Sequence, residues 1–358
     1  MSKIFILSYG DLNGVDGAAI RLKTFAAYVR KLHPNGEIVT ICSIREQLTQ
    51  YTIKVYYDND LVYEKSSKDY IIFFRTIIKR SLNLARVRGF NEFLTIEKTP
   101  EIYVHTLRVF GSLTAELKQF VKHIDVCDNN TLAYRQAAKS YLIHRRFHLG
   151  LLLLNEARVE ENLLRLASSQ NIRLSFITRD DMSSDRNSMI LPNIYKPEYC
   201  GNSSEFPKAP YTYGIIGNFR TLANKSIIEN FKKSNLNVVG SSVKLFGLNA
   251  EGLSGERVFV HGAYDTNLDI IKKFDIGLCL VTLRGGIQNK VIDYLSMGKV
   301  ALVSNEVYDA FRKDPTFELL SHSPFLVRIG DAHQQMSQVF TTENYRRNEH
   351  LYKKYQND

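Results

Sequence analysis

The sequence has few of the features that mark a secreted, disulfide-stabilised or membrane-spanning protein. Its four cysteines lie far apart and form no Cys-x-x-Cys pair, so neither a disulfide framework nor a zinc knuckle is expected. Its densest apolar run, Leu149–Leu154, is well short of the roughly 18 residues that span a bilayer. The strand-like run Lys3–Ser8 leaves no room for a cleaved signal peptide. We therefore expect reduced thiols and a soluble, cytoplasmic protein.

Motifs for nucleic-acid binding are missing as well: there is no RNP signature, zinc finger or helix-turn-helix pattern. The formal charge of +10 nevertheless favours polyanionic partners, such as an anionic membrane surface or a phosphate-bearing substrate. Residues 70–82 mix large apolar side chains with basic ones. They fit either an amphipathic helix in a membrane interface or a core helix with a solvated basic face. We expect no nucleic-acid partner and keep the inner face of the plasma membrane as a candidate location.

The order of expected elements indicates an α/β protein with two domains. A chain of 358 residues is about twice the usual domain size, and β-branched apolar runs alternate with helix-period stretches throughout. Residues 196–210 contain three prolines and a polar cluster, which indicates a linker. We predict two doubly wound, Rossmann-like parallel-sheet domains, 1–195 and 211–340, that face a central cleft. A C-terminal helix in 341–358 is expected to pack back on the first domain.

The expected elements follow this division. In the first half, the expected strands are 4–8, 38–42, 53–57, 102–105, 124–127, 174–177 and 189–191. The expected helices there are 18–32, 112–122, 132–146 and 155–168. In the second half, the expected strands are 213–216, 238–240, 258–260, 276–281 and 300–304. The expected helices there are 226–233, 268–273, 288–297 and 343–354.

A glycine-containing loop, 9–17, follows the first expected strand and leads into a helix. Such a loop aims free backbone amides and the positive end of the helix dipole at one point, which suits a phosphate. Gly14 and Gly17 are therefore candidate ligand-binding residues. The spacing is not Gly-x-Gly-x-x-Gly, which disfavours a dehydrogenase. A tight loop in which Gly17 merely starts the helix explains the pattern equally well.

The second half contains a denser set of candidate residues. The strand 276–281 is followed by Gly285 and Gly286 and then by a helix from Gln288 to Met297. The glycines let the backbone approach a ligand closely, and the first amides of the helix are free donors. The candidate residues of this block are Gly286, Ile287, Gln288, Asn289, Lys290 and Asp293. Lys290 adds a positive charge, and Asp293 can accept hydrogen bonds from ribose hydroxyls. The alternative is a glycine-capped helix with solvated charges.

The loop after the first strand of the second domain supplies further cations. It contains Asn218, Arg220 and Lys225, and we expect it to face the cleft. Two cations there would stabilise a nucleoside diphosphate leaving group, because negative charge grows on it as the glycosidic bond breaks. Alternatively, Arg220 and Lys225 are ordinary charged residues of the protein surface.

The block Gly285–Ser304 resembles the donor-site signature of retaining glycosyltransferase family 4, in which a glycine-rich loop leads into N-K-x-x-E-Y-x-x-x-G-K-P-V-V-x-S. Asp293 stands where that family has its ribose-binding glutamate. The loop Gly-Ile-Gln-Asn-Lys before it resembles that of a bacterial cell-surface polysaccharide branch. The family usually has Glu-x7-Glu, and Gly285 replaces the first glutamate. Val300-Ala301 likewise replaces proline-valine.

Other stretches resemble the family in the same order along the chain. They are the glycine loop from Gly14 to Arg21, the turn Pro192-Asn193-Ile194, the five-residue spacing of Arg220 and Lys225, and the D-x-x-D strand ending Asp125-Val126-Cys127-Asp128. The strand 102–105, followed by Thr106-Leu107-Arg108, resembles the segment that faces the transferred sugar. His105 at its end would bond the donor sugar or steady developing charge, or it is a structural histidine.

The resemblance implies a GT-B fold and transfer with retention of anomeric configuration. It implies a nucleotide-sugar donor on the second domain and a saccharide or lipid-linked acceptor on the first. It also implies no cofactor and no metal, because helix amides and basic side chains replace the divalent ion. The triplet Asp58-Asn59-Asp60 matches the DxD of metal-dependent transferases, but we interpret it as a turn.

Two rival functions remain at this point. The first is a GT-B nucleotide-sugar epimerase or hydrolase, which would convert the donor without an acceptor. The second is a non-catalytic sugar-nucleotide-binding subunit, which the glycine at position 285 makes credible. The leading prediction is a glycosyltransferase of cell-surface polysaccharide synthesis.

Overall fold

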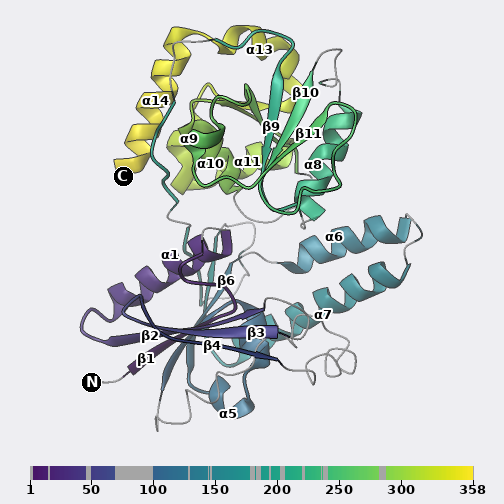
Figure 1. The fold of residues 1–358 in the computed structure, drawn as a ribbon. Helices are drawn as coiled ribbons and strands as arrows, with labels where there is room; N and C mark the ends of the chain where they lie inside the picture. Colours follow the sequence, from purple (N-terminus) through teal and green to yellow (C-terminus); the bar gives the residue numbers. More distant parts are fainter. Residues whose placement is uncertain are drawn as a thin grey trace. The chain divides into compact units, whose positions relative to one another are not determined.

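The computed structural model describes residues 3–14, 17–45, 50–68, 100–127, 130–143, 145, 147–177, 182, 187–192, 195–201, 206–219, 222–234, 236, 241–281 and 288–357. The chain divides into two compact units, unit 1 with residues 1–194 and unit 2 with residues 195–358 (Figure 1). No helix within the described residues is long and apolar enough to cross a membrane.

The described part of unit 1 contains an eight-stranded sheet in the order β4-β3-β2-β1-β5-β6-β7-β8. The strands are β1 (Lys3–Ser8), β2 (Glu37–Arg45), β3 (Gln50–Tyr57), β4 (Asp60–Lys68), β5 (Glu101–His105), β6 (Val121–Cys127), β7 (Arg173–Phe176) and β8 (Ser188–Ile190). The helices are α1 (Gly17–Leu32), α4 (Leu107–Ser112), α5 (Ala115–Lys118), α6 (Asn130–Ile143) and α7 (Phe147–Ser169).

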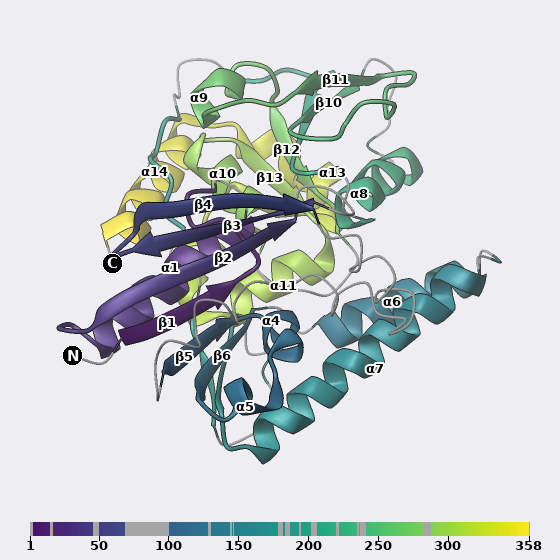
Figure 2. The same cartoon turned by 60° about the horizontal axis from the view of Figure 1, so that its bottom comes forward.

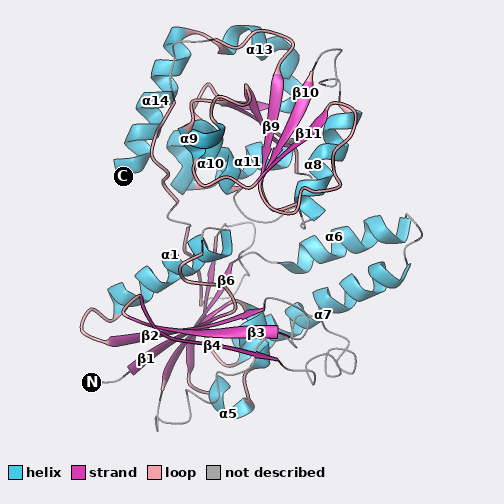
Figure 3. Cartoon of the chain, viewed as in Figure 1, coloured by secondary structure: helices cyan, strands magenta, loops and turns pink. Residues whose placement is uncertain are grey.

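Both faces of this sheet are buried, as a doubly wound fold requires. Along β1, Ile4 and Ile6 belong to a core cluster with Phe25 of α1. Phe5 and Leu7 belong to a second cluster, with Phe110 of α4. Successive side chains of a strand point to opposite faces, so helices cover both faces (Figure 3). The predicted parallel doubly wound arrangement is confirmed for β2, β1 and β5 to β8.

One edge of the sheet differs from the prediction. The segment 53–57 was expected to be a strand of a parallel sheet, but β3 pairs antiparallel with β2. The strand β4, which pairs antiparallel with β3, was not among the expected strands. The strands β3 and β4 run antiparallel because a tight turn joins them, at Asp58 and Asn59, whose φ angles are 47° and 76°. A two-residue loop with both φ positive joins antiparallel strands. The prediction that the DxD triplet forms a turn is confirmed.

The prediction of a single helix at 112–122 is also wrong. The structure has α4, then α5, and β6 begins at Val121. Thr114 starts α5, and its side chain accepts a hydrogen bond from the Leu117 amide. Val121 pairs with Ile102 in the sheet. The sheet pairing therefore ends the helix that the local pattern would allow to continue.

Unit 2 has a six-stranded sheet in the order β11-β10-β9-β12-β13-β14 within its described residues, and every pair is parallel. The strands are β9 (Thr212–Ile216), β10 (Ser242–Phe246), β11 (Val258–Gly262), β12 (Ile276–Cys279), β13 (Val300–Val303) and β14 (Leu326–Arg328). The helices are α8 (Leu222–Lys233), α9 (Asn267–Ile270), α10 (Asn289–Ser296), α11 (Asn305–Lys313), α12 (Glu318–Ser321), α13 (Ala332–Val339) and α14 (Thr342–Asn357).

The strands β10 and β14 and the helices α11 to α13 were not among the expected elements. The strand expected at 238–240 lies outside the described residues. The centre of the sheet is fixed by close contact of a ring with a backbone. A Cβ on Gly277 would lie 2.2 Å from the Tyr294 ring. The Tyr294 hydroxyl accepts from the Ile216 amide. These contacts hold α10 against β9 and β12.

The C-terminal helix α14 contacts α10 and α12. It also bonds the start of unit 2, because the Tyr352 hydroxyl donates to the Pro197 carbonyl and the Tyr355 hydroxyl to the Tyr195 carbonyl. The described residues of the expected linker, 196–210, therefore pack within unit 2. The predicted docking of this helix on the first domain stays a prediction.

One buried histidine of unit 1 lies among aromatic rings. His123 of β6 is 1% exposed, and it meets the rings of Phe25 and Tyr28 edge-on, each at 5.3 Å. Neither ring nitrogen has a hydrogen-bond partner within the described part of the chain. Burial lowers the pKa of His123 to about 4. The imidazole is therefore neutral in the folded protein.

This burial predicts an acid-sensitive stability. The pKa of His123 is below its ordinary 6.5 in the folded state, so the unfolded chain binds the extra proton. Stability should then fall by about 3 kcal/mol as the pH drops from 6.5 towards 4. The variant His123→Phe should flatten this dependence in denaturation measured between pH 7 and about 5.5, where carboxylates of ordinary pKa stay mostly ionised. The exposed His148→Gln is the matched control, and an unchanged slope in His123→Phe would contradict the assignment.

Candidate functional site

The candidate residues of unit 1 gather at the carboxyl ends of its central strands. In doubly wound sheets, ligands bind at the point where the strand order reverses, which here lies between β1 and β5. The loop after β1 leads into α1 there. His105 ends β5, and Asp125 and Cys127 lie at the end of β6. The fold therefore brings together residues that are far apart in the sequence.

A buried ion pair organises this edge. The Arg21 guanidinium of α1 bonds both carboxylate oxygens of Asp125, with Nε 2.7 Å from Oδ2. It also donates to the Leu191 carbonyl, and the Ser175 hydroxyl donates to Asp125 Oδ1 at 2.7 Å. Burial alone would raise the pKa of Asp125, but the Arg21 charge and these hydrogen bonds hold it below its usual value. The carboxylate is therefore ionised.

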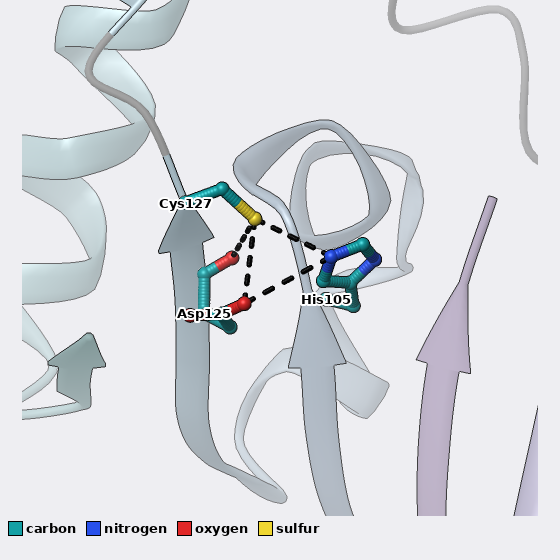
Figure 4. A group of neighbouring side chains, drawn as sticks. All are labelled: His105, Asp125 and Cys127. Carbon is teal, nitrogen blue, oxygen red and sulfur yellow. Dashed lines mark hydrogen bonds and ion pairs between the residues drawn. The ribbon is translucent and has the colours of Figure 1, made fainter. Parts of the chain in front are cut away.

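His105 is buried beside this pair, with 1% exposure. Its Nδ1 lies 3.0 Å from Ser8 Oγ, which already accepts from the Gly10 amide at 3.0 Å. A hydroxyl has one hydrogen to donate and two positions at which to accept, so the direction of the bond between Ser8 and Nδ1 depends on the imidazole tautomer. Nε2 faces Cys127 Sγ at 3.3 Å and Asp125 Oδ2 at 3.8 Å (Figure 4). Both ring nitrogens have partners within unit 1, as the structural alternative for His105 requires.

The backbone around His105 is strained. Thr106 has φ 82° and Cys127 has φ 64°, a left-handed region that non-glycine residues seldom adopt. The Thr106 amide donates to the Asp125 carbonyl at 2.8 Å. Such conformations cluster at functional sites. Thr106 Oγ1 is buried and has no hydrogen-bond partner among the described residues.

Among the described side chains, three of these residues lie close enough together to hold a metal ion. One ligand atom from each of His105, Asp125 and Cys127 lies within 4.8 Å of the others. A cation there would meet the Arg21 guanidinium, which already neutralises Asp125 through both of its oxygens. Adding a divalent ion would leave excess positive charge in a buried place. The arrangement therefore favours the ion pair over a metal.

The glycine loop of unit 1 has the predicted position between β1 and α1. Gly14 closes a turn, donating to the Asp11 carbonyl at 3.1 Å, and a Cβ there would lie 2.8 Å from Ala19 Cβ. Gly17 is the first residue of α1. This packing fits the alternative given above, a tight loop in which Gly17 starts the helix. A ligand role for Gly14 and Gly17 stays a prediction.

The second set of candidates gathers at the corresponding place in unit 2, between β9 and β12. Lys290 of α10 donates through Nζ to the side chain of Asn224 in α8. Asn224 in turn donates to the Asn218 carbonyl at 2.8 Å. The backbone of Gly217 fits only without a side chain, since a Cβ there would lie 2.4 Å from Asn224. The predicted residues Asn218 and Lys290 are thus linked through Asn224.

Asp293 lies one turn further along α10 than Lys290, and its hydrogen-bond partners are two other neutral side chains. The Tyr195 hydroxyl donates to Asp293 Oδ1 at 2.5 Å, and the Asn267 amide donates to the same oxygen at 3.1 Å. Burial raises the pKa of Asp293, and these bonds and Lys290 offset part of the rise. Burial likewise lowers the pKa of Lys290. Both side chains therefore lack a full counter-charge.

The start of α10 places main-chain and side-chain groups at this edge of the sheet. The Gln288 side chain makes no capping bond to the helix, and the Val291 amide donates to the Gln288 carbonyl at 2.9 Å. Asn289 Oδ1 is buried and has no partner among the described residues. Lys225 is exposed on α8. The predicted residues Arg220, Gly286 and Ile287 lie outside the described residues, as does Gly285.

Several residues at these two places had no role predicted from the sequence. Arg21 was seen only as the end of the glycine loop, Cys127 only as part of the D-x-x-D strand, and Tyr195 not at all. A long-range pairing signal was available for Arg21, since an arginine in the first helix and an aspartate in a core strand both need a buried partner. Nothing local marks Tyr195 as a partner of Asp293.

Comparison with known proteins shows the fold. No known family profile matches the sequence, and no curated protein sequence matches it. Sucrose-phosphate synthase from Thermosynechococcus elongatus is similar in structure, with a TM-score of 0.55 and 11% identity over 98% of this chain and 95% of its own. An alpha-glucosyltransferase in complex with UDP and a mismatched DNA has a TM-score of 0.52 and 12% identity, over 99% and 96%. Anabaena HepE in complex with UDP-glucose has a TM-score of 0.50 and 9% identity, over 100% and 94%.

These likenesses extend over both units, and the identities are low enough that they establish the architecture alone. The chain has the GT-B fold of glycosyltransferases, with two Rossmann-like domains of parallel sheet. The predicted fold class is confirmed, and the cleft expected between the two domains stays a prediction.

The ion pair of unit 1 makes a stability prediction. Asp125→Asn leaves the Arg21 guanidinium buried without a counter-charge, so unfolding should become easier by about 3–5 kcal/mol. Ser175→Ala removes one hydroxyl bond to the same carboxylate and should cost about 1 kcal/mol. The measurement is chemical denaturation followed by circular dichroism. The double variant Arg21→Met/Asp125→Asn should be less destabilised than the sum of the single variants, and simple additivity would show that the pair is not coupled.

Proposed function

We propose that the protein is a retaining glycosyltransferase that takes a sugar from a nucleotide-sugar donor, with UDP-sugars as the first candidates. The observation that carries the proposal is the placement of Lys290 and Asp293 on one helix at the switch point of unit 2. In open parallel sheets this edge is where nucleotides bind. The GT-B fold, and solved relatives in complex with UDP or UDP-glucose, support it.

Each residue of unit 2 has a chemical task in this proposal. Lys290 and the positive end of the α10 helix dipole would hold the diphosphate, whose negative charge increases as the glycosidic bond breaks. Asp293 would accept hydrogen bonds from the ribose hydroxyls. Arg220 and Lys225 would add positive charge to the leaving group, and Asn218 would position the loop. With this many fixed donors, we propose that the reaction needs no metal.

Unit 1 would contribute the acceptor side. We propose that His105, fixed by Ser8 and by the Asp125 pair, positions the edge that meets the transferred sugar. The acceptor would be a saccharide or lipid-linked saccharide of cell-surface polysaccharide synthesis, used at an anionic membrane face. The family-4 resemblance of the Gly285–Ser304 block supports both the acceptor class and retention of configuration.

A second candidate function has one specific observation in its favour. Gly285 stands where related enzymes have a glutamate, which fits a protein that binds a nucleotide sugar without transferring it. Such a subunit would bind the donor and release no sugar from it. A GT-B epimerase or hydrolase would convert the donor with no acceptor present.

Donor binding can be tested by titration calorimetry with UDP. The variants Lys290→Ala and Asp293→Ala should each lose about 10–100-fold in affinity, because each removes a hydrogen bond that involves a charged group. The exposed Lys232→Ala, at the end of α8, is the matched control and should bind as the unchanged protein does. Asp293 is further tested with 2′-deoxy-UDP: the unchanged protein should prefer UDP, and Asp293→Ala should lose the preference. Unaltered affinity in both variants would place the donor elsewhere.

The reaction itself can be tested by NMR with a panel of UDP-, GDP- and CMP-sugars. We expect slow release of the sugar from one donor, with the first-formed anomer matching the donor's own configuration. EDTA should leave the rate unchanged, because amides and basic side chains replace a metal ion. Release must disappear in Lys290→Ala, which excludes a contaminating hydrolase. Inversion of the anomer, or loss of activity in EDTA, would overturn the mechanism.

A further inference from the structure

The helices α6 and α7 of unit 1 form an antiparallel hairpin, and the ends that are joined point away from the sheet (Figure 2). The two helices approach closely at Gly150, where a Cβ would lie 2.7 Å from Leu142 Cγ. An ion pair of 2.7 Å between Arg135 and Glu161 joins them further along. The hairpin is therefore a firmly packed element with a defined outer surface.

The outer surface near the tip of the hairpin is apolar. Phe147, Leu151 and Leu154 of α7 are 59%, 63% and 40% exposed. At 100° per residue they lie within about 60° of one another on the helix. Ile143, at the end of α6, is 68% exposed. We call these four residues the apolar tip.

The inner face of α7 buries charged side chains as well as apolar ones. Glu156 and Glu160 are each only 3% exposed, and Glu160 lies 3.5 Å from Arg108. A helix on the surface of a protein normally buries its apolar side and exposes its charges. Here the apolar tip is left outside although the same helix buries two carboxylates. The described residues of unit 1 leave these four side chains exposed.

The charge around the apolar tip has one sign. Residues 129–155 contain no aspartate or glutamate, but they include four arginine or lysine residues and two histidines. Lys139, Arg145 and His148 are exposed beside the tip. Large exposed apolar patches mark interaction sites, and the basic surroundings select an anionic partner.

We propose that the apolar tip is a membrane-docking surface that enters the headgroup region of an anionic lipid bilayer, with Lys139 and Arg145 bonding lipid phosphates. A short apolar face flanked by cations is the pattern of interfacial helices. The inference rests on the proposed function in one respect: a lipid-linked acceptor would be presented at such a surface. It assigns membrane contact to the hairpin, whereas the sequence had pointed to residues 70–82, which lie outside the described residues.

The test is co-sedimentation of the full-length protein with vesicles of phosphatidylcholine alone or with about one third phosphatidylglycerol. We expect binding only to the anionic vesicles, with weaker binding at high salt. Phe147→Ser/Leu151→Ser should reduce the partition coefficient by at least about tenfold. Lys139→Gln/Arg145→Gln should reduce it by about fivefold for each cation removed.

Matched controls are present elsewhere in the chain. Leu268→Ser removes a leucine that is 66% exposed in unit 2, and Lys232→Gln/Lys233→Gln removes two exposed lysines at the end of α8. Both controls should bind vesicles as the unchanged protein does. UDP affinity is measured on every variant, because it should stay constant. A protein that binds vesicles but no nucleotide would disprove the donor site and keep the docking surface.

Three results would overturn the inference. The first is failure of the unchanged protein to bind anionic vesicles. The second is unaltered vesicle binding by both hairpin variants. The third is a lower melting temperature or a changed oligomeric mass in Phe147→Ser/Leu151→Ser, which would show that another part of the chain or a second copy covers the apolar tip.

Discussion

The carboxyl edge of unit 1 depends on one buried carboxylate. Asp125 of β6 holds Arg21 of α1 and Ser175 of β7, and His105 of β5 lies against it. Arg21 reaches on to the chain after β8 through the Leu191 carbonyl. Because neither charge of the pair reaches water, separating them would be costly, and the pair holds α1 against β6 and the chain after β8. The strained residues Thr106 and Cys127 lie at the same edge, where such packing can hold them.

The charged residues of unit 2 are arranged in the opposite way. Lys290 and Asp293 are held by neutral partners, Asn224 for the first and Tyr195 with Asn267 for the second. Burial shifts the pKa of each towards its uncharged form. Arg21 and Asp125 satisfy each other, and so have little left to offer a ligand. Lys290 and Asp293 would gain from one, since a diphosphate favours a charged lysine and ribose hydroxyls favour a charged aspartate. This contrast makes unit 2 the better candidate for the nucleotide.

Much of the fold followed from the sequence, because strands such as β1, β9 and β12 are buried on both faces and appear as short apolar runs. The antiparallel strand β4 did not, since its pattern in the structure is almost wholly exposed. The placement of Lys290 and Asp293 could be predicted from a glycine-rich loop before a helix. Their partners could not, because Asn224 and Tyr195 are 66 and 98 residues away. A contact of that range leaves no trace in a local pattern.

The hairpin shows why apolar composition and burial must be read separately. Leu149–Leu154 is the densest apolar run in the chain, and by composition alone it belongs in a core. The structure turns this helix so that Glu156 and Glu160 face inward, where Arg108 lies beside them. Because Glu156 and Glu160 face inward, the residues on the opposite side of the helix face outward, and Leu151 and Leu154 are exposed. A solvent-facing role would have favoured polar residues at those positions. Leucines there, beside cations and without acids, therefore mark a surface with a partner of its own.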